Sequence, residues 1–258
     1  MLLALGTQSA EDVPMTRPIA HCHIATLVRG LALAMLVTFT LPPNAYASDE
    51  PSVFVFLPND LRARAFEKLL SSAMPGVNIT VFGRLKDFQD NIKKSPPDAV
   101  LTLRDVLEEQ TGISSVLQGS EGGKTQEPYV LVSVDSRANI EGDSVIGVVD
   151  ILGRKKMPAF VNKVVNTKTK VKRVAKPEDL LSLLQFKMVD AVLIPKASFR
   201  SLEAKTELNL VVSDAPGAVF LPALGFLSTN HEAKLSSAVK KLGGEVSKLI
   251  RVSSWRAN

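Results

Sequence analysis

Cysteine, histidine and aromatic residues are scarce in this chain of 258 residues. It contains one Cys, three His, two Tyr and one Trp, and the single Cys22 lies close to the N-terminus. One cysteine cannot form an internal disulfide, and no cluster of Cys and His offers metal ligands or a Cys–His nucleophile. The G-x-S-x-G, H-E-x-x-H and G-x-x-x-x-G-K-[ST] motifs are also absent. These absences predict a protein that is not an enzyme and has no catalytic residues, metal ion or cofactor.

No charge of one sign dominates the composition. The 31 Lys and Arg residues stand against 26 Asp and Glu, which leaves a net charge of +5. So small an excess argues against a nucleic-acid partner. Hydrophobic residues make up 45% of the chain and charged residues 22%, which excludes a disordered or fibrous protein. The length is sufficient for one large domain or two small ones with a real core.

An apolar run of twelve residues, 30–41, lies between a basic flank and a small-residue pattern. Arg17 and Arg29 precede the run, and Ala45 and Ala47 follow it as an A-x-A cleavage pattern. This order is typical of a secretory signal peptide. A membrane anchor needs roughly 20 apolar residues, so the run is too short to be one. We therefore predict an exported protein, most simply a periplasmic one.

Cleavage after Ala47 assigns residues 1–47 to the signal peptide and 48–258 to the mature protein. Residues 1–14 precede the usual pattern of such a leader, and one interpretation is a start-site artefact with Met15 as the true start. Cys22 lies in the leader, so the mature protein contains no cysteine and has no thiol chemistry.

The first half of the mature chain alternates between β-rich runs and segments with helical spacing of apolar residues. The expected strands are 52–57, 77–82 and 98–103, and the expected helices are 61–74 and 85–95. Asp60 is placed to cap the first of these helices. The β-α-β-α-β order predicts a parallel sheet covered by helices.

A second unit with the same order begins near residue 140. Its expected strands are 144–149, 170–175 and 188–194, and its expected helices are 157–165 and 178–186. An apolar strand at 129–135 connects the two units, and strands at 208–214 and 224–229 with one final helix at 231–251 lead back. We therefore assign 48–134 and 208–258 to lobe I and 135–207 to lobe II. The Gly-rich segment 119–127 is expected to be a mobile loop.

This order of segments resembles the periplasmic solute-binding proteins of ABC transporters, in the two-lobed type 2 fold. The resemblance is carried by the leader ending AYA, GKTQEPYVLVS (123–133), IEGDSVIGVVD (140–150) and KPEDLLSLLQFKMVDAVLIP (176–195). It covers the arrangement of nearly all of 50–250 and is greatest for the phosphate- and phosphonate-binding branch. It implies an α/β fold of two lobes, each a mostly parallel sheet flanked by helices. It also implies capture of a small, anionic solute for a membrane permease, by a protein expected to be a monomer.

Ligands of open α/β sheets bind beyond the carboxyl ends of the strands, and the candidate binding residues follow from this rule. They are Asn59, Asp60, Thr102, Arg104, Tyr129, Asp150, Gly153, Arg154 and Lys196. Arg104 could hold a carboxylate or other oxyanion through paired hydrogen bonds, or it could be a solvated surface residue. Tyr129 could stack on a ligand or pack at the hinge. The branch named above usually has a Ser/Thr-rich turn where this chain has DILGRKKMPAF, in which only Gly153 suits close backbone approach.

Residues 154–176 contain nine Lys or Arg and no acidic residue. The simplest interpretation is a solvated basic face. The alternating lysines of KTKVKR fit an exposed edge strand, and the stretch lacks the interleaved aromatic residues that bind single-stranded nucleic acid. The alternative function is a periplasmic sensor or accessory protein that docks on a membrane partner through this face. The candidate docking residues are Lys168, Lys170, Lys172 and Arg173.

Overall fold

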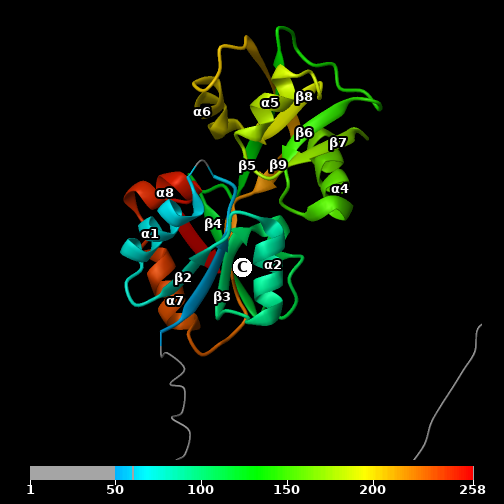
Figure 1. The fold of residues 1–258 in the computed structure, drawn as a ribbon. Helices are drawn as coiled ribbons and strands as arrows, with labels where there is room; N and C mark the ends of the chain where they lie inside the picture. The colour runs from blue at the N-terminus through cyan, green and yellow to red at the C-terminus, as the bar shows by residue number, and fades with distance from the viewer. Residues whose placement is uncertain (1–49, 60, 258) are drawn as a thin grey trace, which may run out of the picture. The chain divides into compact units, whose positions relative to one another are not determined.

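A computed structural model describes residues 50–59 and 61–257 and arranges their strands in two sheets flanked by helices (Figure 1). The predicted signal peptide, including Ala45 and Ala47, lies outside the described residues, and so does Asp60. None of the helices in the described part is long and apolar enough to cross a bilayer. The alternation of strands and helices confirms the predicted α/β class.

The first sheet has six strands in the order β11-β4-β10-β3-β1-β2. These are β1 (Ser52–Phe56), β2 (Asn78–Val81), β3 (Ala99–Leu103), β4 (Ser115–Ser120), β10 (Pro222–Phe226) and β11 (Ser254–Ala257). β1 pairs in parallel with β2 and β3, whereas β10 runs antiparallel to β3 and β4. Figure 1 shows α2 (Leu85–Lys94) on one side of this sheet and α1 (Ala63–Ala73) on the other.

The second sheet has five strands in the order β7-β6-β8-β5-β9. These are β5 (Gln126–Val134), β6 (Val145–Val149), β7 (Lys170–Val174), β8 (Ala191–Pro195) and β9 (Leu210–Phe220). Its helical segments are α4 (Gly153–Val165), α5 (Asp179–Gln185), the 3-10 turn η1 (Lys196–Ser198) and α6 (Phe199–Glu203). β6 is parallel to β7 and β8, and β5 is antiparallel to β8 and β9, so both sheets are mixed.

The chain passes between the two sheets at two places. It leaves the first sheet after β4 and returns to it between β9 and β10, where the Leu221 N–H donates to the Thr125 carbonyl at 2.9 Å. The strand pairing places β5 and β9 in the second sheet, although 129–134 and 208–214 were assigned to lobe I from the sequence. We keep lobe I and lobe II as names for the units built around the first and second sheets.

The last part of the chain differs from the prediction. One helix was expected over 231–251, but the structure has two, α7 (Glu232–Lys240) and α8 (Gly244–Ile250). Gly244 has φ +57°, which favours glycine and breaks the helical path. Leu235, Val239 and Val246 are nevertheless buried, because each of the two shorter helices keeps its apolar face on the core.

Several short elements were not predicted. They include β4, β11 and α3 (Arg104–Leu107), which have little periodicity in the sequence. The Gly-rich segment 119–127 contains the end of β4, a tight turn and the start of β5, which lie in different sheets. Its turn is closed by Glu121 and Lys124, which exchange backbone hydrogen bonds of 2.9 and 3.0 Å.

One apolar core continues from the first sheet to α4. It contains the strand residues Val53, Val55 and Leu101 together with Met157 and Val161 of α4. A smaller cluster lies on the other face of the second sheet, where Leu180 and Leu184 of α5 pack on β8. The shared core holds the carboxyl ends of the central strands close to the junction of the lobes, where the candidate site lies.

Candidate functional site

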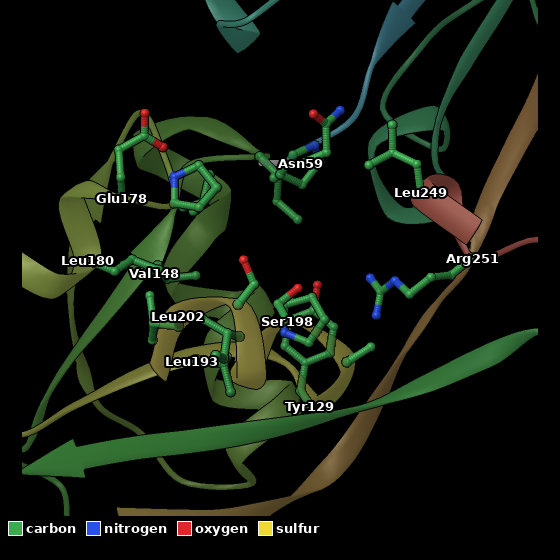
Figure 2. A pocket seen from close by; sticks show the side chains of 18 of the residues that line it. Asn59, Tyr129, Val148, Glu178, Leu180, Leu193, Ser198, Leu202, Leu249 and Arg251 are labelled. Carbon is green, nitrogen blue, oxygen red and sulfur yellow. The ribbon is translucent and has the colours of Figure 1, made fainter. Parts of the chain in front are cut away.

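A pocket of about 430 Å³, which we call the central pocket, lies at the carboxyl ends of β6 and β8 (Figure 2). Its volume is within the ~300–1,000 Å³ that is usual for small-molecule sites. Lobe II supplies most of its lining, and lobe I supplies Pro58 and Asn59 after β1 and the end of α8. The rule that ligands bind beyond the carboxyl ends of parallel strands therefore leads to this pocket.

Apolar side chains form most of the central pocket's walls, and nine polar or charged residues complete the lining. The apolar residues are Pro58, Val148, Val149, Ile151, Phe160, Pro177, Leu180, Leu193, Ile194, Pro195, Ala197, Leu202 and Leu249. The polar residues are Asn59, Glu121, Tyr129, Glu178, Ser198, Ser201, Lys205, Lys248 and Arg251. Such a lining suits a ligand with an apolar body and few polar groups.

Arg251 brings a guanidinium into the central pocket from the turn after α8. Figure 2 shows this group pointing toward Ser198 and Tyr129. Its Nη2 donates to Oε1 of Glu127 at 2.7 Å, and its Nη1 is ion-paired with the other carboxylate oxygen. Glu127 lies on β5 and is 5% exposed. A carboxylate this deeply buried needs a cationic partner, so the pair is held in one orientation.

The electrostatics around Arg251 are nearly balanced. Burial lowers the pKa of the guanidinium, while the Glu121 carboxylate opposes this shift. Arg251 and Lys248 are therefore offset by Glu127 and Glu121 at this end of the pocket. The guanidinium still has N–H groups beyond those that face Glu127, because an arginine side chain carries five.

Tyr129 lies on β5 in the floor of the central pocket and is 5% exposed. Burial raises the pKa of its hydroxyl, and the charge of Asp105 raises it further. The group is therefore a neutral phenol at physiological pH, able to donate a hydrogen bond. The ring packs at the lobe junction and lines the pocket, so the packing alternative is confirmed and stacking on a ligand stays a prediction.

A second compartment of about 300 Å³ adjoins the central pocket. The two share Pro58, Asn59, Val149, Pro177 and Glu178. The Asn59 amide bridges its own loop, donating to the Leu57 carbonyl at 3.2 Å and accepting from the Leu61 N–H at 2.8 Å. The side chain is therefore held in place at the rim of both compartments.

A third compartment, which we call the α4 pocket, also has a volume of about 300 Å³. It lies at the first turn of α4, where Arg154, Lys155 and Lys156 line it. Gly153 has φ +75°, and its N–H donates to Asp150 Oδ1 at 2.7 Å. Lys156 is ion-paired with Glu109. The predicted ligands Gly153 and Arg154 thus lie in a different compartment from Asn59 and Tyr129.

Four other predicted binding residues make structural contacts and line none of these three compartments. The Thr102 hydroxyl is fully buried and donates to the Phe56 carbonyl at 2.7 Å, which ties β3 to β1. Arg104 Nε donates to Glu108 Oε1 at 3.0 Å. Asp150 is ion-paired with Arg173, and Lys196 Nζ lies 2.8 Å from Asp214 Oδ1.

The predicted docking residues lie on or beside β7, which is an edge strand of the second sheet. Lys168, Lys170 and Lys172 are exposed there. Arg173 is committed to Asp150, so it contributes less free charge to this surface than the lysines do. Elsewhere, no group of three or more His, Cys, Asp or Glu within the described residues could hold a metal ion.

Comparison with known proteins supports the fold. No family model matches the chain, and no curated protein matches its sequence. Among solved structures, the ligand-binding core of GluR0 in complex with L-glutamate has a TM-score of 0.56 at 10% identity, covering 80% of this chain and 98% of that one. A mutant of ArgBP from T. maritima has a TM-score of 0.53 at 17% identity, with coverage of 78% and 94%.

The periplasmic VFT2 domain of BvgS from Bordetella pertussis is also similar, with a TM-score of 0.51 at 16% identity and coverage of 79% and 93%. The chain thus has the two-lobed α/β fold of type 2 periplasmic binding proteins, as predicted. At these identities the likeness concerns the fold alone.

The residues that sequence reasoning missed come from the last helix and the lobe junction. Lys248, Arg251 and Ser198 line the central pocket, and Glu127 holds Arg251. None of them belongs to a motif, and the C-terminal segment was interpreted as one helix. The available signal was weak: an arginine after the last apolar helix, and an acidic residue at the start of an apolar crossover strand.

Proposed function

We propose that this protein is an exported solute-binding protein that captures a small organic acid in the central pocket. The observation that carries the proposal is the pocket itself, at the carboxyl ends of β6 and β8 and lined from both lobes. The two-lobed fold supports it, because residues on both sides of a ligand can exclude water when the lobes approach one another.

The solute's acidic group is supported by the polar end of the central pocket. Arg251 and Lys248 offer positive charge, and Tyr129 and Ser198 offer hydroxyl donors near it. An arginine can hold an oxyanion through paired hydrogen bonds. We further propose that the loaded protein delivers its solute to a membrane permease of the ABC class from the periplasm, and that it acts as a monomer without catalysis.

A thermal-shift screen of the purified protein tests the proposal. The panel contains aliphatic and aromatic carboxylates, amino acids, phosphate, phosphonates and sulfonates. A ligand present at about 100 times its dissociation constant stabilises the protein by ~2.7 kcal/mol, which raises the melting temperature by a few degrees. We expect acids with an apolar body to give the largest shift. A folded protein that responds to no member of the panel would contradict the proposal.

A second candidate function is docking on a membrane sensor or complex through β7. The observation that favours it is the exposed, lysine-rich edge of the second sheet. An edge strand has unpaired backbone groups that a partner could engage, and lysines would attract an acidic surface. Reversing Lys168, Lys170 and Lys172 to Glu tests this in a pull-down from membrane extracts. Loss of a captured partner supports docking, and an unchanged result contradicts it.

A further inference from the structure

Resting on the proposed function, we propose that the central pocket selects a singly charged carboxylate attached to an apolar body. Arg251 binds the carboxylate through hydrogen bonds. The buried Glu127 already neutralises Arg251, which limits the negative charge that the ligand can carry. Phosphates and phosphonates are therefore not the preferred ligands, in contrast to the expectation from the order of segments in the sequence.

The Arg251 guanidinium is oriented so that it can bind a carboxylate in the central pocket. Glu127 engages Arg251 through both of its oxygens, so the guanidinium plane is fixed before any ligand arrives. Figure 2 shows the same guanidinium aimed into the central pocket, with Ser198 and Tyr129 in front of it. A planar carboxylate can accept two hydrogen bonds from a guanidinium, and nearby hydroxyls can bind its remaining lone pairs.

The charges around the central pocket are balanced. Its lining contains three cations, Arg251, Lys248 and Lys205, and two carboxylates, Glu121 and Glu178, and the buried Glu127 paired with Arg251 is a third carboxylate. The pocket therefore has no excess positive charge that a dianion would need. Burying an uncompensated charge is costly, and the cost grows with each further charge on the ligand. Among anions, a monoanion has the lowest burial cost, and it can still accept hydrogen bonds from the guanidinium's free N–H groups.

The lobe II lining of the central pocket fits an apolar ligand body. Val148, Leu180, Leu193 and Leu202 form an apolar wall on lobe II. Leu180 and Leu193 are at most 2% exposed, so this wall is part of the packed core and does not depend on mobile side chains. An aliphatic or aromatic body would replace water on this wall, whereas a polar side chain would find few partners there.

Isothermal titration with matched ligands tests the proposal on the purified protein. The head-group set keeps one body and varies its end: 4-methylpentanoate, 4-methylpentanamide and 3-methylbutylphosphonate. We expect the carboxylate to bind about 10- to 100-fold more tightly than the amide, since it accepts charge-assisted hydrogen bonds. It should also bind more tightly than the phosphonate. The body set runs from acetate to hexanoate, with about a fourfold gain for each buried methylene.

Two variants separate this role from a merely structural one. R251K keeps a cation beside Glu127 but loses the planar set of guanidinium N–H donors. Carboxylate affinity should therefore fall at least tenfold, while amide affinity stays unchanged. R256K is the matched control, because Arg256 is exposed on β11 and lines none of the three compartments. E127Q frees positive charge, so it should shift head-group preference toward the phosphonate. If E127Q only destabilises the fold, the molecules that remain folded should keep the wild-type head-group preference.

The outcomes distinguish this inference from the proposed function. Equal affinity for the carboxylate and the amide, tighter binding of the phosphonate, or an unchanged preference in E127Q would each overturn the inference alone. The same holds if no matched ligand binds while another acid from the broader screen does. If neither the matched ligands nor the screen yields a ligand, the inference and the proposed function both fall.

Discussion

The central pocket and the α4 pocket lie on either side of the loop after β6, and Ile151 lines both. The α4 pocket is basic, with Arg154, Lys155 and Lys156 at a helix start. The central pocket is mostly apolar and contains one arginine held by a buried glutamate. Exposed lysines are surrounded by water, which screens their charge, whereas a fixed guanidinium beside an apolar wall can discriminate among ligands.

A count of positive charges is therefore a poor guide to an anion site. The sequence contains nine basic residues over 154–176, and Arg154, predicted as a ligand from its place after a strand, is the first of them. In the structure, Lys156 is already paired with Glu109, and the basic strand β7 lies at the sheet edge. We therefore expect the two pockets to respond differently to substitution.

The largest effect is expected from filling the central pocket. Ser198 lies in η1 and makes no side-chain capping hydrogen bond, so Ser198→Trp should fold while its indole occupies the space of the ligand. Affinity for the ligand found by the screen should fall more than about 100-fold, since steric exclusion removes the site's whole binding energy. Titration calorimetry measures the loss. Ser182→Trp, on the exposed face of α5, is the matched control and should bind normally.

A large effect on stability is expected from removing Arg251. Arg251→Ala would leave the Glu127 carboxylate buried without its partner, which costs about 3 kcal/mol of unfolding free energy. Urea denaturation measures the change. Arg256→Ala should cost less than about 0.5 kcal/mol, because its side chain is exposed. Equal losses in the two variants would show that the Arg251–Glu127 pair does not fix the central pocket.

A smaller effect is expected from Asp105, which lies at the lobe junction in α3. Burial raises the pKa of this carboxyl group, while Lys163, whose Nζ lies 3.9 Å from Oδ1, opposes the shift. The folded protein therefore holds a proton on Asp105 at pH values where the unfolded chain has lost it. The stability contributed by the protonated form is present below the unfolded pKa and is lost as pH rises through the folded pKa.

Asp105→Asn mimics the protonated carboxyl group. The substitution should therefore remove the loss of stability that follows deprotonation of Asp105. The melting temperature of Asp105→Asn relative to wild type should increase as pH rises from about 4 upward. Asp87→Asn, at an exposed position on α2, is the control for the substitution itself. A relative melting temperature of Asp105→Asn that falls with pH would show that the Lys163 ion pair outweighs the desolvation of Asp105.

The smallest effect is expected in the α4 pocket. Replacing Arg154 and Lys155 together by Gln should change ligand affinity less than about twofold. Both charges are exposed and lie outside the central pocket, so salt screens their effect on the ligand. Titration at physiological ionic strength measures this. A loss comparable to that of R251K would reverse the comparison and place the anion at the start of α4.

The sequence predicted the parallel parts of both sheets well, because strands such as 52–57 and 98–103 are continuous apolar runs separated by amphipathic helices. Short elements without a period, such as β4 and β11, were missed, since their strand character depends on pairing with β10 and with each other. The edge position of the lysine-rich strand at 170–175 was predicted from its alternation and is confirmed.

The candidate site was predicted less well than the fold. Asn59 and Tyr129 line the central pocket, but Thr102 and Asp150 turned out to make internal contacts of the scaffold. A rule about strand ends locates the edge of a sheet, but it cannot tell which side chains point into a cavity. Arg251 reaches the pocket from a segment 122 positions after Tyr129, and no local pattern encodes that approach.

The decisive measurement is a crystal structure of the protein with its best-binding acid. We expect the acid to lie in the central pocket, with its carboxylate on the Arg251 guanidinium and its body against Val148 and Leu193. Ligand density at Gly153 and Arg154, in the α4 pocket, would contradict this expectation.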